Sequence, residues 1–99
     1  MSKKHTRKLK LGGHTVLLKW KSLKDFEDAE DMSIAGYYDF KNKTIYMNQD
    51  QTGSDAQDTL IHEMLHCIDD TFQLALKHKD IHIIATGLQQ LLKPWLKKV

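Results

Sequence analysis

Two histidines and a glutamate stand at a spacing that suits metal-assisted chemistry. The segment His62-Glu63-Met64-Leu65-His66 places two imidazole rings four residues apart. On a helix these rings point in directions about 40° apart and lie ~6 Å apart along the axis. Both can then bind one zinc ion at about 2.0–2.1 Å. We therefore expect His62 and His66 to be zinc ligands.

Glu63 follows the first of these histidines and is rotated from it by about 100° around a helix. In that position it can stand beside the metal without binding it and accept a proton from the metal-bound water. Zinc lowers the pKa of such a water towards ~7 and polarises a substrate carbonyl. Because these are the parts needed to hydrolyse an amide bond, Glu63 is predicted to be the general base.

A catalytic zinc site generally takes three protein ligands and one water. His78 is our first choice for the third ligand. It lies twelve residues beyond His66, which is ~18 Å along a continuous helix, so the chain must reverse between residues 73 and 78. After such a reversal, His78 leads the last predicted helix on its inward face. His82 and Asp80 stay open as alternatives, and either can instead face the substrate or orient a ligand.

Other polar residues near the motif have both a functional and an ordinary interpretation. Asp69, one turn after His66, can accept the free ring N–H of a liganding histidine, or it is, like Asp70, a solvent-side residue. Cys67 is expected to be a buried apolar cysteine rather than a thiolate ligand. A phenol can stabilise a tetrahedral intermediate, although tyrosines in strands more often pack. The tyrosines concerned are Tyr37, Tyr38 and Tyr46.

The motif is expected on a helix that begins at Ser54-Asp55-Ala56-Gln57. These residues fit a capping box, in which the Ser54 hydroxyl accepts the Gln57 amide and the Gln57 side chain reaches back. The helix should run to about residue 73 and bury one apolar stripe. The members of the stripe are Leu60, Ile61, Met64, Leu65, Ile68 and Phe72.

A second set of apolar residues at helical spacing predicts a last helix that stops before Pro94. Its members are Ile81, Ile84, Ala85, Leu88, Leu91 and Leu92. Before the motif helix, alternating residues around Gly12-Gly13 predict a first hairpin. Residues 34–40 and 44–48 predict a second hairpin, with Asn42 in a left-handed turn conformation. Residues 21–32 are acidic and are expected to form a loop or a short surface helix. The fold class is therefore α+β, with a small sheet of hairpins followed by two helices.

Composition is that of one compact folded domain covering residues 1–99, with residues 1–8 as a flexible basic tail. The chain has 99 residues, 40% hydrophobic and 28% charged, with a formal net charge of +2. We see no transmembrane segment and no secretion signal. The single cysteine is compatible with a reducing compartment, so we expect a cytoplasmic protein without a membrane partner. The basic tail offers a contact for nucleic acid, but a solvated tail is the interpretation we favour.

Several segments together resemble a known family. They are Gly36-Tyr37-Tyr38-Asp39, Thr44-Ile45-Tyr46-Met47-Asn48, residues 59–69 with the His-Glu-x-x-His motif, and Ile81 with Ala85-Thr86-Gly87-Leu88. They are similar to the small phage- and prophage-encoded zincins, gluzincin-like metallopeptidase homologues loosely similar to the SprT-like and ImmA/IrrE groups. The resemblance implies a peptide or protein substrate that lies along an edge strand, Thr44–Asn48 here. It also implies a third zinc ligand, commonly glutamate, at the position that His78 occupies.

Two other functions compete with a zinc-dependent metallopeptidase. The first is a non-catalytic module that keeps zinc for structure and binds a partner through its sheet edge or basic arm. The presence of Glu63 speaks against it, because a structural zinc site does not need a base. The second is a metal-free interaction protein of phage or prophage origin.

Overall fold

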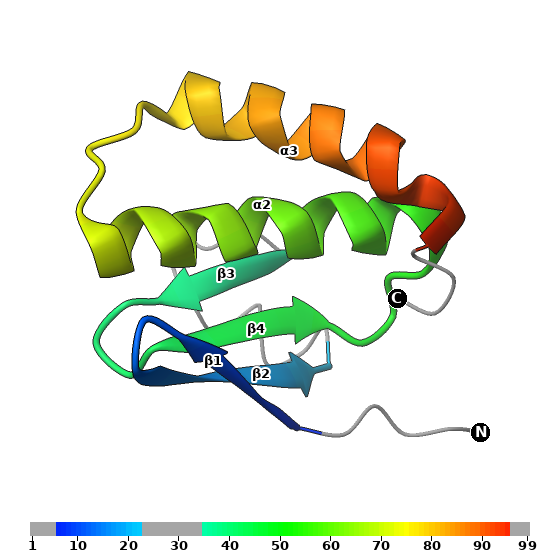
Figure 1. Ribbon diagram of the computed structural model, residues 1–99. Helices are drawn as coiled ribbons and strands as arrows, with labels where there is room; N and C mark the ends of the chain where they lie inside the picture. The colour runs from blue at the N-terminus through cyan, green and yellow to red at the C-terminus, as the bar shows by residue number, and fades with distance from the viewer. Residues whose placement is uncertain (1–5, 23–34, 96–99) are drawn as a thin grey trace.

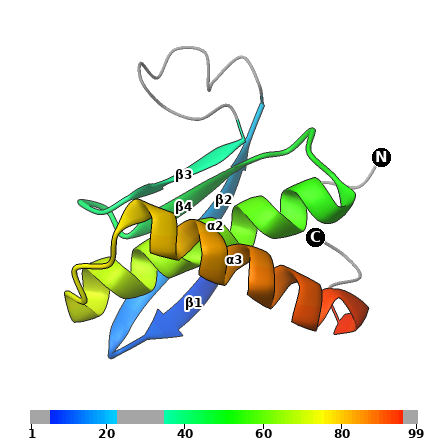
Figure 2. The same cartoon turned by 90° about the horizontal axis from the view of Figure 1, so that it is seen from above.

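The computed structural model describes residues 6–22 and 35–95. Four strands form one sheet: β1 (Arg7–Leu11), β2 (His14–Lys21), β3 (Gly36–Asp39) and β4 (Thr44–Asn48). Two helices follow, α2 (Gly53–Phe72) and α3 (His78–Leu92), and a short 3₁₀ turn covers Lys93–Trp95. Helix α2 lies between the sheet and α3, so the domain has three layers (Figures 1 and 2). The predicted α+β class is confirmed. None of the described helices is long and apolar enough to cross a membrane.

The sheet is mixed, with strand order β1-β2-β4-β3. The two hairpins pair antiparallel as predicted, and β2 runs parallel to β4, which joins them. Strand β4 is the most buried, with Ile45 1% and Met47 0% exposed. The expectation that Thr44–Asn48 is an edge strand is therefore wrong. Its side chains fill the core beneath α2, and β3 occupies the end of the described sheet instead.

The two hairpin turns differ in how well they were predicted. Gly12 and Gly13 have φ of +56° and +82°, the left-handed conformation that glycine adopts without strain. In the second turn the prediction for Asn42 is wrong, because Lys43 is the residue with positive φ (+48°). Asn42 instead donates its side-chain amide to Asp39 Oδ2 at 2.8 Å, while its backbone amide donates to Asp39 Oδ1. The aspartate therefore organises the turn.

Helix α2 begins differently from the prediction and ends as expected. Thr52 is the N-cap residue, and no side-chain hydrogen bond caps the helix. The predicted capping box is wrong, because Ser54 already lies in the first turn and Gln57 is buried. The side-chain oxygen Oε1 of Gln57 accepts a hydrogen bond from the side-chain amide of Gln89 on α3 at 3.3 Å. The Gln57 side chain therefore makes a tertiary contact with α3 in place of the local capping-box hydrogen bond.

The core has two parts because α2 is apolar on two sides. Toward the sheet, Leu60 and Cys67 pack with Val16, Leu18, Ile45 and Met47. Toward α3, Ile61 and Leu65 pack with Ile81 and Ala85. We predicted one buried stripe on this helix, but two of its sides are buried, one against the sheet and one against α3. The last member of the predicted stripe, Phe72, is 52% exposed.

Helix α3 ends before Pro94 as predicted, but only one side of it is buried. Ile81 and Ala85 are 1% exposed and face α2, whereas Ile84, Leu91 and Leu92 are 40%, 76% and 39% exposed. Leu88 packs beside Ile81 and Ala85 on the inward side, because α2 is the one described helix against which α3 packs. The predicted loop over residues 21–32 lies largely outside the described residues, as do residues 1–5 of the predicted basic tail. Arg7 and Lys8, the last residues of that predicted tail, belong to β1 instead.

Gly36 on β3 lies so close to β4 and α2 that a larger side chain at this position should lower the stability of the fold. A Cβ atom on Gly36 would lie 2.8 Å from the carbonyl oxygen of Tyr46 and 2.9 Å from Thr59 Cγ2. We expect Gly36→Ala to lower the free energy of unfolding by roughly 1–3 kcal/mol, because β3 must shift. Gly87→Ala is the matched control, since its Cβ meets nothing within 4 Å, and it should gain about 0.5–1 kcal/mol. Urea unfolding measures both, and an unchanged midpoint for Gly36→Ala would contradict the described packing.

Candidate functional site

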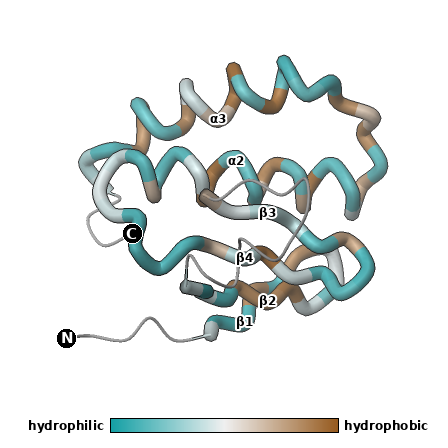
Figure 3. Tube along the Cα trace, turned by 180° about the vertical axis from the view of Figure 1, so that it is seen from behind, coloured by the Kyte–Doolittle hydropathy of each residue, from teal (hydrophilic) through white to brown (hydrophobic). Residues whose placement is uncertain are grey.

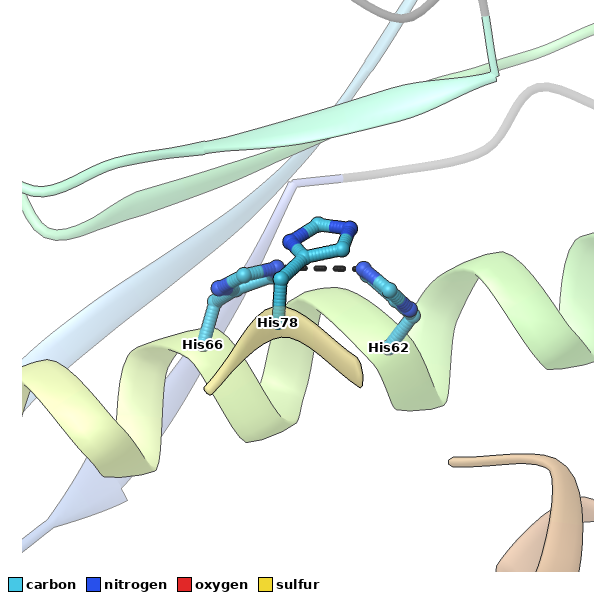
Figure 4. Close-up of side chains that lie close together, drawn as sticks. All are labelled: His62, His66 and His78. Carbon is cyan, nitrogen blue, oxygen red and sulfur yellow. Dashed lines mark hydrogen bonds between the residues drawn. The ribbon is translucent and has the colours of Figure 1, made fainter. Parts of the chain in front are cut away.

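The structure brings His62 and His66 of α2 together with His78, the first residue of α3 (Figure 4). The ring centroid of His78 lies 5.2 Å from the ring centroid of His62 and 5.3 Å from that of His66. One ring nitrogen from each of the three lies within 4.8 Å of the others, which is close enough for one metal ion. The chain reversal that the spacing required is therefore present.

The separations of the ring nitrogens test whether an ion fits. Around a tetrahedral ion with bonds of ~2.0–2.1 Å, ligand atoms lie about 3.4 Å apart. The Nε2 atoms of His62 and His66 lie 3.0 Å apart, slightly closer than this, and the widest separation in the cluster is within 4.8 Å. Small rotations of exposed or half-buried rings bridge this difference. The three imidazoles are thus able to hold a metal ion, with a neutral nitrogen donor set that suits zinc, copper, iron and nickel alike.

Asp69 holds the loop that returns the chain to His78. Its backbone carbonyl accepts the amides of Gln73 and Leu74, and its Oδ1 accepts the amide of Leu76 at 2.9 Å. Gln73 and Ala75 adopt positive φ of 50° and 60°, which turns the backbone sharply without glycine. The sequence suggested Asp69 as the partner of a histidine N–H. Its described hydrogen bonds give it a different role, the fixing of the interhelix loop.

Burial tunes the two histidines of α2 toward the neutral form that binds metal. Desolvation lowers the pKa of His62, and the neighbouring His66 and His78 lower it further. Desolvation likewise lowers the pKa of His66, followed by the effect of His78. A lowered pKa keeps an imidazole neutral at a pH where an ordinary histidine would start to protonate. Both rings are therefore ready to act as ligands at neutral pH.

Glu63 is buried beside this cluster. It is 8% exposed, and burial raises the pKa of its carboxyl group to about 7, against an ordinary value of 4.5. The backbone N–H of Tyr38 on β3 donates to the carboxylate, which offsets part of this rise in the pKa. The carboxyl group is thus held between α2 and β3 with a pKa suited to proton transfer near neutral pH.

A cleft of about 400 Å³ opens next to Glu63 and His66. Its other walls come from Tyr37, Tyr38 and Phe40 of the second hairpin and from Asp69 and Asp70 at the end of α2. The Tyr38 hydroxyl donates to Asp70 Oδ2 at 2.8 Å, and Lys43 lies 3.6 Å from the same oxygen. The pKa of Tyr38 is raised by burial and by this bond, so its phenol holds its proton. Most of the side chains that line the cleft are therefore aromatic or acidic.

The sequence identified some, but not all, of the residues that line the cleft. It treated Asp70 as a solvent-side residue and did not single out Phe40, although both line the cleft. Among the three tyrosines it named, Tyr46 does not line the cleft; its ring stacks on Tyr37 at 4.9 Å. Cys67 is 2% exposed and lies in the core, as expected. Only the tertiary arrangement of β3 over the end of α2 reveals which residues form the walls.

The two alternative third ligands lie outside the three-histidine cluster. The ring of His82 is 6.3 Å from that of His62, one turn further along α3 than His78, and Asp80 is not part of the group that can share one ion.

Comparisons with protein-family models, with characterised proteins and with solved structures give no match to this chain. The functional argument therefore depends on the geometry and chemistry of the site.

The raised pKa of Glu63 predicts a pH effect on stability. The folded state holds this proton more tightly than the unfolded chain, so the stabilising effect is full below pH 4.5 and is lost as the pH rises through about 7. In the presence of a chelator, the wild type should lose roughly 2 kcal/mol between pH 5 and pH 8 relative to Glu63→Gln. Urea unfolding of both proteins at the two pH values measures the difference. Parallel pH profiles would contradict a buried, proton-holding Glu63.

Proposed function

We propose that this protein is a zinc-dependent metallopeptidase of the zincin type. His62, His66 and His78 would hold the zinc ion, and Glu63 would act as general base. The observation that carries the proposal is the convergence of three imidazoles from two helices next to a buried carboxyl group whose pKa is raised to about 7. General bases work best when their pKa lies near the operating pH.

Zinc bound here would supply Lewis-acid chemistry, which acidifies water and polarises a carbonyl group. The residues of the chain do the rest. The Glu63 carboxylate takes the proton of the attacking water and then delivers it to the leaving amine. The amide of Tyr38 keeps the carboxylate oriented during both transfers.

A peptide or protein is the substrate class that fits the cleft. Strand β3 stands at the end of the described sheet, and its Tyr38 forms one wall of the cleft that contains Glu63 and His66. An extended peptide that lies along β3 passes over this cleft and brings a carbonyl group near both residues. The zincin resemblance assigned this role to Thr44–Asn48, and we move it to β3 because β4 is an interior strand.

The metal proposal is tested by zinc titration of protein stripped of metal and purified without a histidine tag. We expect one zinc per chain, and we expect His78→Ala to weaken zinc affinity by at least about tenfold, because one of three ligands is lost. His14→Ala is the matched control, since His14 is an exposed histidine on β2 away from the cluster. Equal zinc affinity for His78→Ala and His14→Ala would contradict the ligand set.

The catalytic proposal is tested with zinc-loaded protein and quenched fluorescent unfolded casein. Removal of a positioned general base typically costs about 10²–10⁴-fold in rate. Glu63→Gln should therefore keep its zinc and lose activity on that scale. A zinc-binding wild type with no activity, or equal activity for the two proteins, would exclude Glu63-dependent hydrolysis. A non-catalytic zinc-binding module would then be the function supported by the remaining data.

A further inference from the structure

The sheet has one face that none of the described helices or strands covers. Both helices lie on the other side of the sheet (Figures 1 and 3). Successive side chains along a strand point to opposite faces, and Val16, Leu18, Ile45 and Met47 point into the core under α2. Their neighbours along the strands therefore point away from the helices. We call this side the outer sheet face and define it by Lys8, Lys10, Lys19, Lys21, Tyr37 and Tyr46.

Basic residues are concentrated in the sheet, and acidic residues in the helices. The described sheet and its turns, residues 6–22 and 35–52, contain seven lysines and arginines but two acidic residues. Residues 53–95, which form the helices, contain three lysines and six acidic residues. The described sheet and helices thus carry opposite net charges, although the whole chain has a formal net charge of only +2. This separation produces a positive potential over the outer sheet face, which attracts polyanions.

The strand register places lysines on one side of the outer sheet face and tyrosines on the other. Lys8 and Lys10 are exposed on β1. Lys19 on β2 is half-buried and lies beside Tyr46, its partner on β4. Tyr46 in turn pairs with Tyr37 on β3, and the two ring centroids lie 4.9 Å apart. The face therefore has a basic side over β1 and β2 and an aromatic side over β4 and β3.

Lys21 holds the aromatic side in place. Its ammonium group donates to the Tyr37 hydroxyl at 2.9 Å and lies 4.1 Å from the centroid of the Tyr46 ring, a cation–π contact. The tyrosines are thus ordered before any partner binds, which lowers the entropic cost of binding. Asp39 is the only acidic residue of the four described strands, and its Oδ2 accepts the side-chain amide of Asn42.

We propose that the outer sheet face binds single-stranded nucleic acid. The phosphates lie along the lysines of β1 and β2, and the bases pack against the tyrosines of β4 and β3. Surfaces that bind single strands without sequence preference combine these two features, a basic surface for the backbone and aromatic side chains for the bases. An acidic protein or an anionic membrane would contact the lysines but has no bases for the aromatic side. Binding here does not need the proposed metal ion, because the three clustered histidines belong to α2 and α3.

Fluorescence anisotropy of a labelled oligothymidylate of about 15 nucleotides tests the proposal. The full chain is used, with a chelator present so that the result is independent of the metal. We expect a dissociation constant of about 1–100 µM at low salt. Phosphate contacts from Lys8, Lys10 and Lys19 predict roughly 20-fold weaker binding when the salt rises from about 50 to about 200 mM. No binding at protein concentrations up to about 1 mM in the low-salt buffer would overturn the proposal.

A pair of double variants tests whether the lysines of this face make the contacts. Lys8→Gln with Lys19→Gln should weaken binding by at least about fivefold and flatten its salt dependence, because two phosphate contacts are lost. Lys77→Gln with Lys79→Gln is the matched control, since it removes the same charge from two exposed lysines at the start of α3. The control should bind like the wild type. Equal weakening in both double variants would show an effect of net charge alone and refute the outer sheet face as the site.

Other polyanions and the position of the bases give the last test. Base–aromatic packing should make oligothymidylate bind at least about tenfold tighter than a polyglutamate peptide of equal charge or vesicles that contain phosphatidylserine. Ultraviolet crosslinking followed by mass spectrometry should place thymine adducts on peptides that contain Tyr37 or Tyr46. Equally tight binding of polyglutamate or of the vesicles, or adducts confined to α2 and α3, would contradict the proposal.

Discussion

The packing of α3 against α2 is the interaction on which the site depends. His62 and His66 are neighbours by helix geometry alone, but His78 reaches them only because the chain reverses after Phe72 and α3 returns along α2. Ile61 and Leu65 on one helix and Ile81 and Ala85 on the other hold this return in place. The carbonyl and carboxylate of Asp69 fix the loop between them. A shift of α3 by one turn would move His78 by about 5.4 Å and open the cluster.

Burial of polar groups is the second feature of the site, and it costs stability. The Glu63 carboxyl is buried between α2 and β3, with the amide of Tyr38 as its described partner in the sheet. Such a group stabilises the fold only when protonated, which is the opposite of what an ordinary surface glutamate does. The same strand holds Tyr38 against Asp70. Strand β3 thus positions the carboxyl group and also shapes the cleft where a substrate would lie.

Several features that depend on short stretches of sequence were predicted well, although the local capping box at Ser54 and the turn conformation of Asn42 were not. The His-Glu-x-x-His spacing, the Gly12-Gly13 turn, the end of α2 near residue 73 and the stop before Pro94 are all local signals. Features that depend on distant parts of the chain were not. The parallel pairing of β2 with β4, the interior place of β4 and the bond between Gln57 and Gln89 need the folded arrangement. The same holds for Asp70, whose partner Tyr38 lies 32 residues away in sequence.

The central claim is that three imidazoles from two helices share one metal ion. X-ray absorption at the zinc edge of the stoichiometric complex tests it most directly, because it counts and identifies the ligands. We predict three imidazole nitrogens at about 2.0–2.1 Å with one or two further oxygen ligands and no sulfur. A signal from only two imidazoles would exclude His78 as a ligand. A sulfur atom at ~2.3 Å would require the buried Cys67 to leave the core, and the geometry described here would then be wrong.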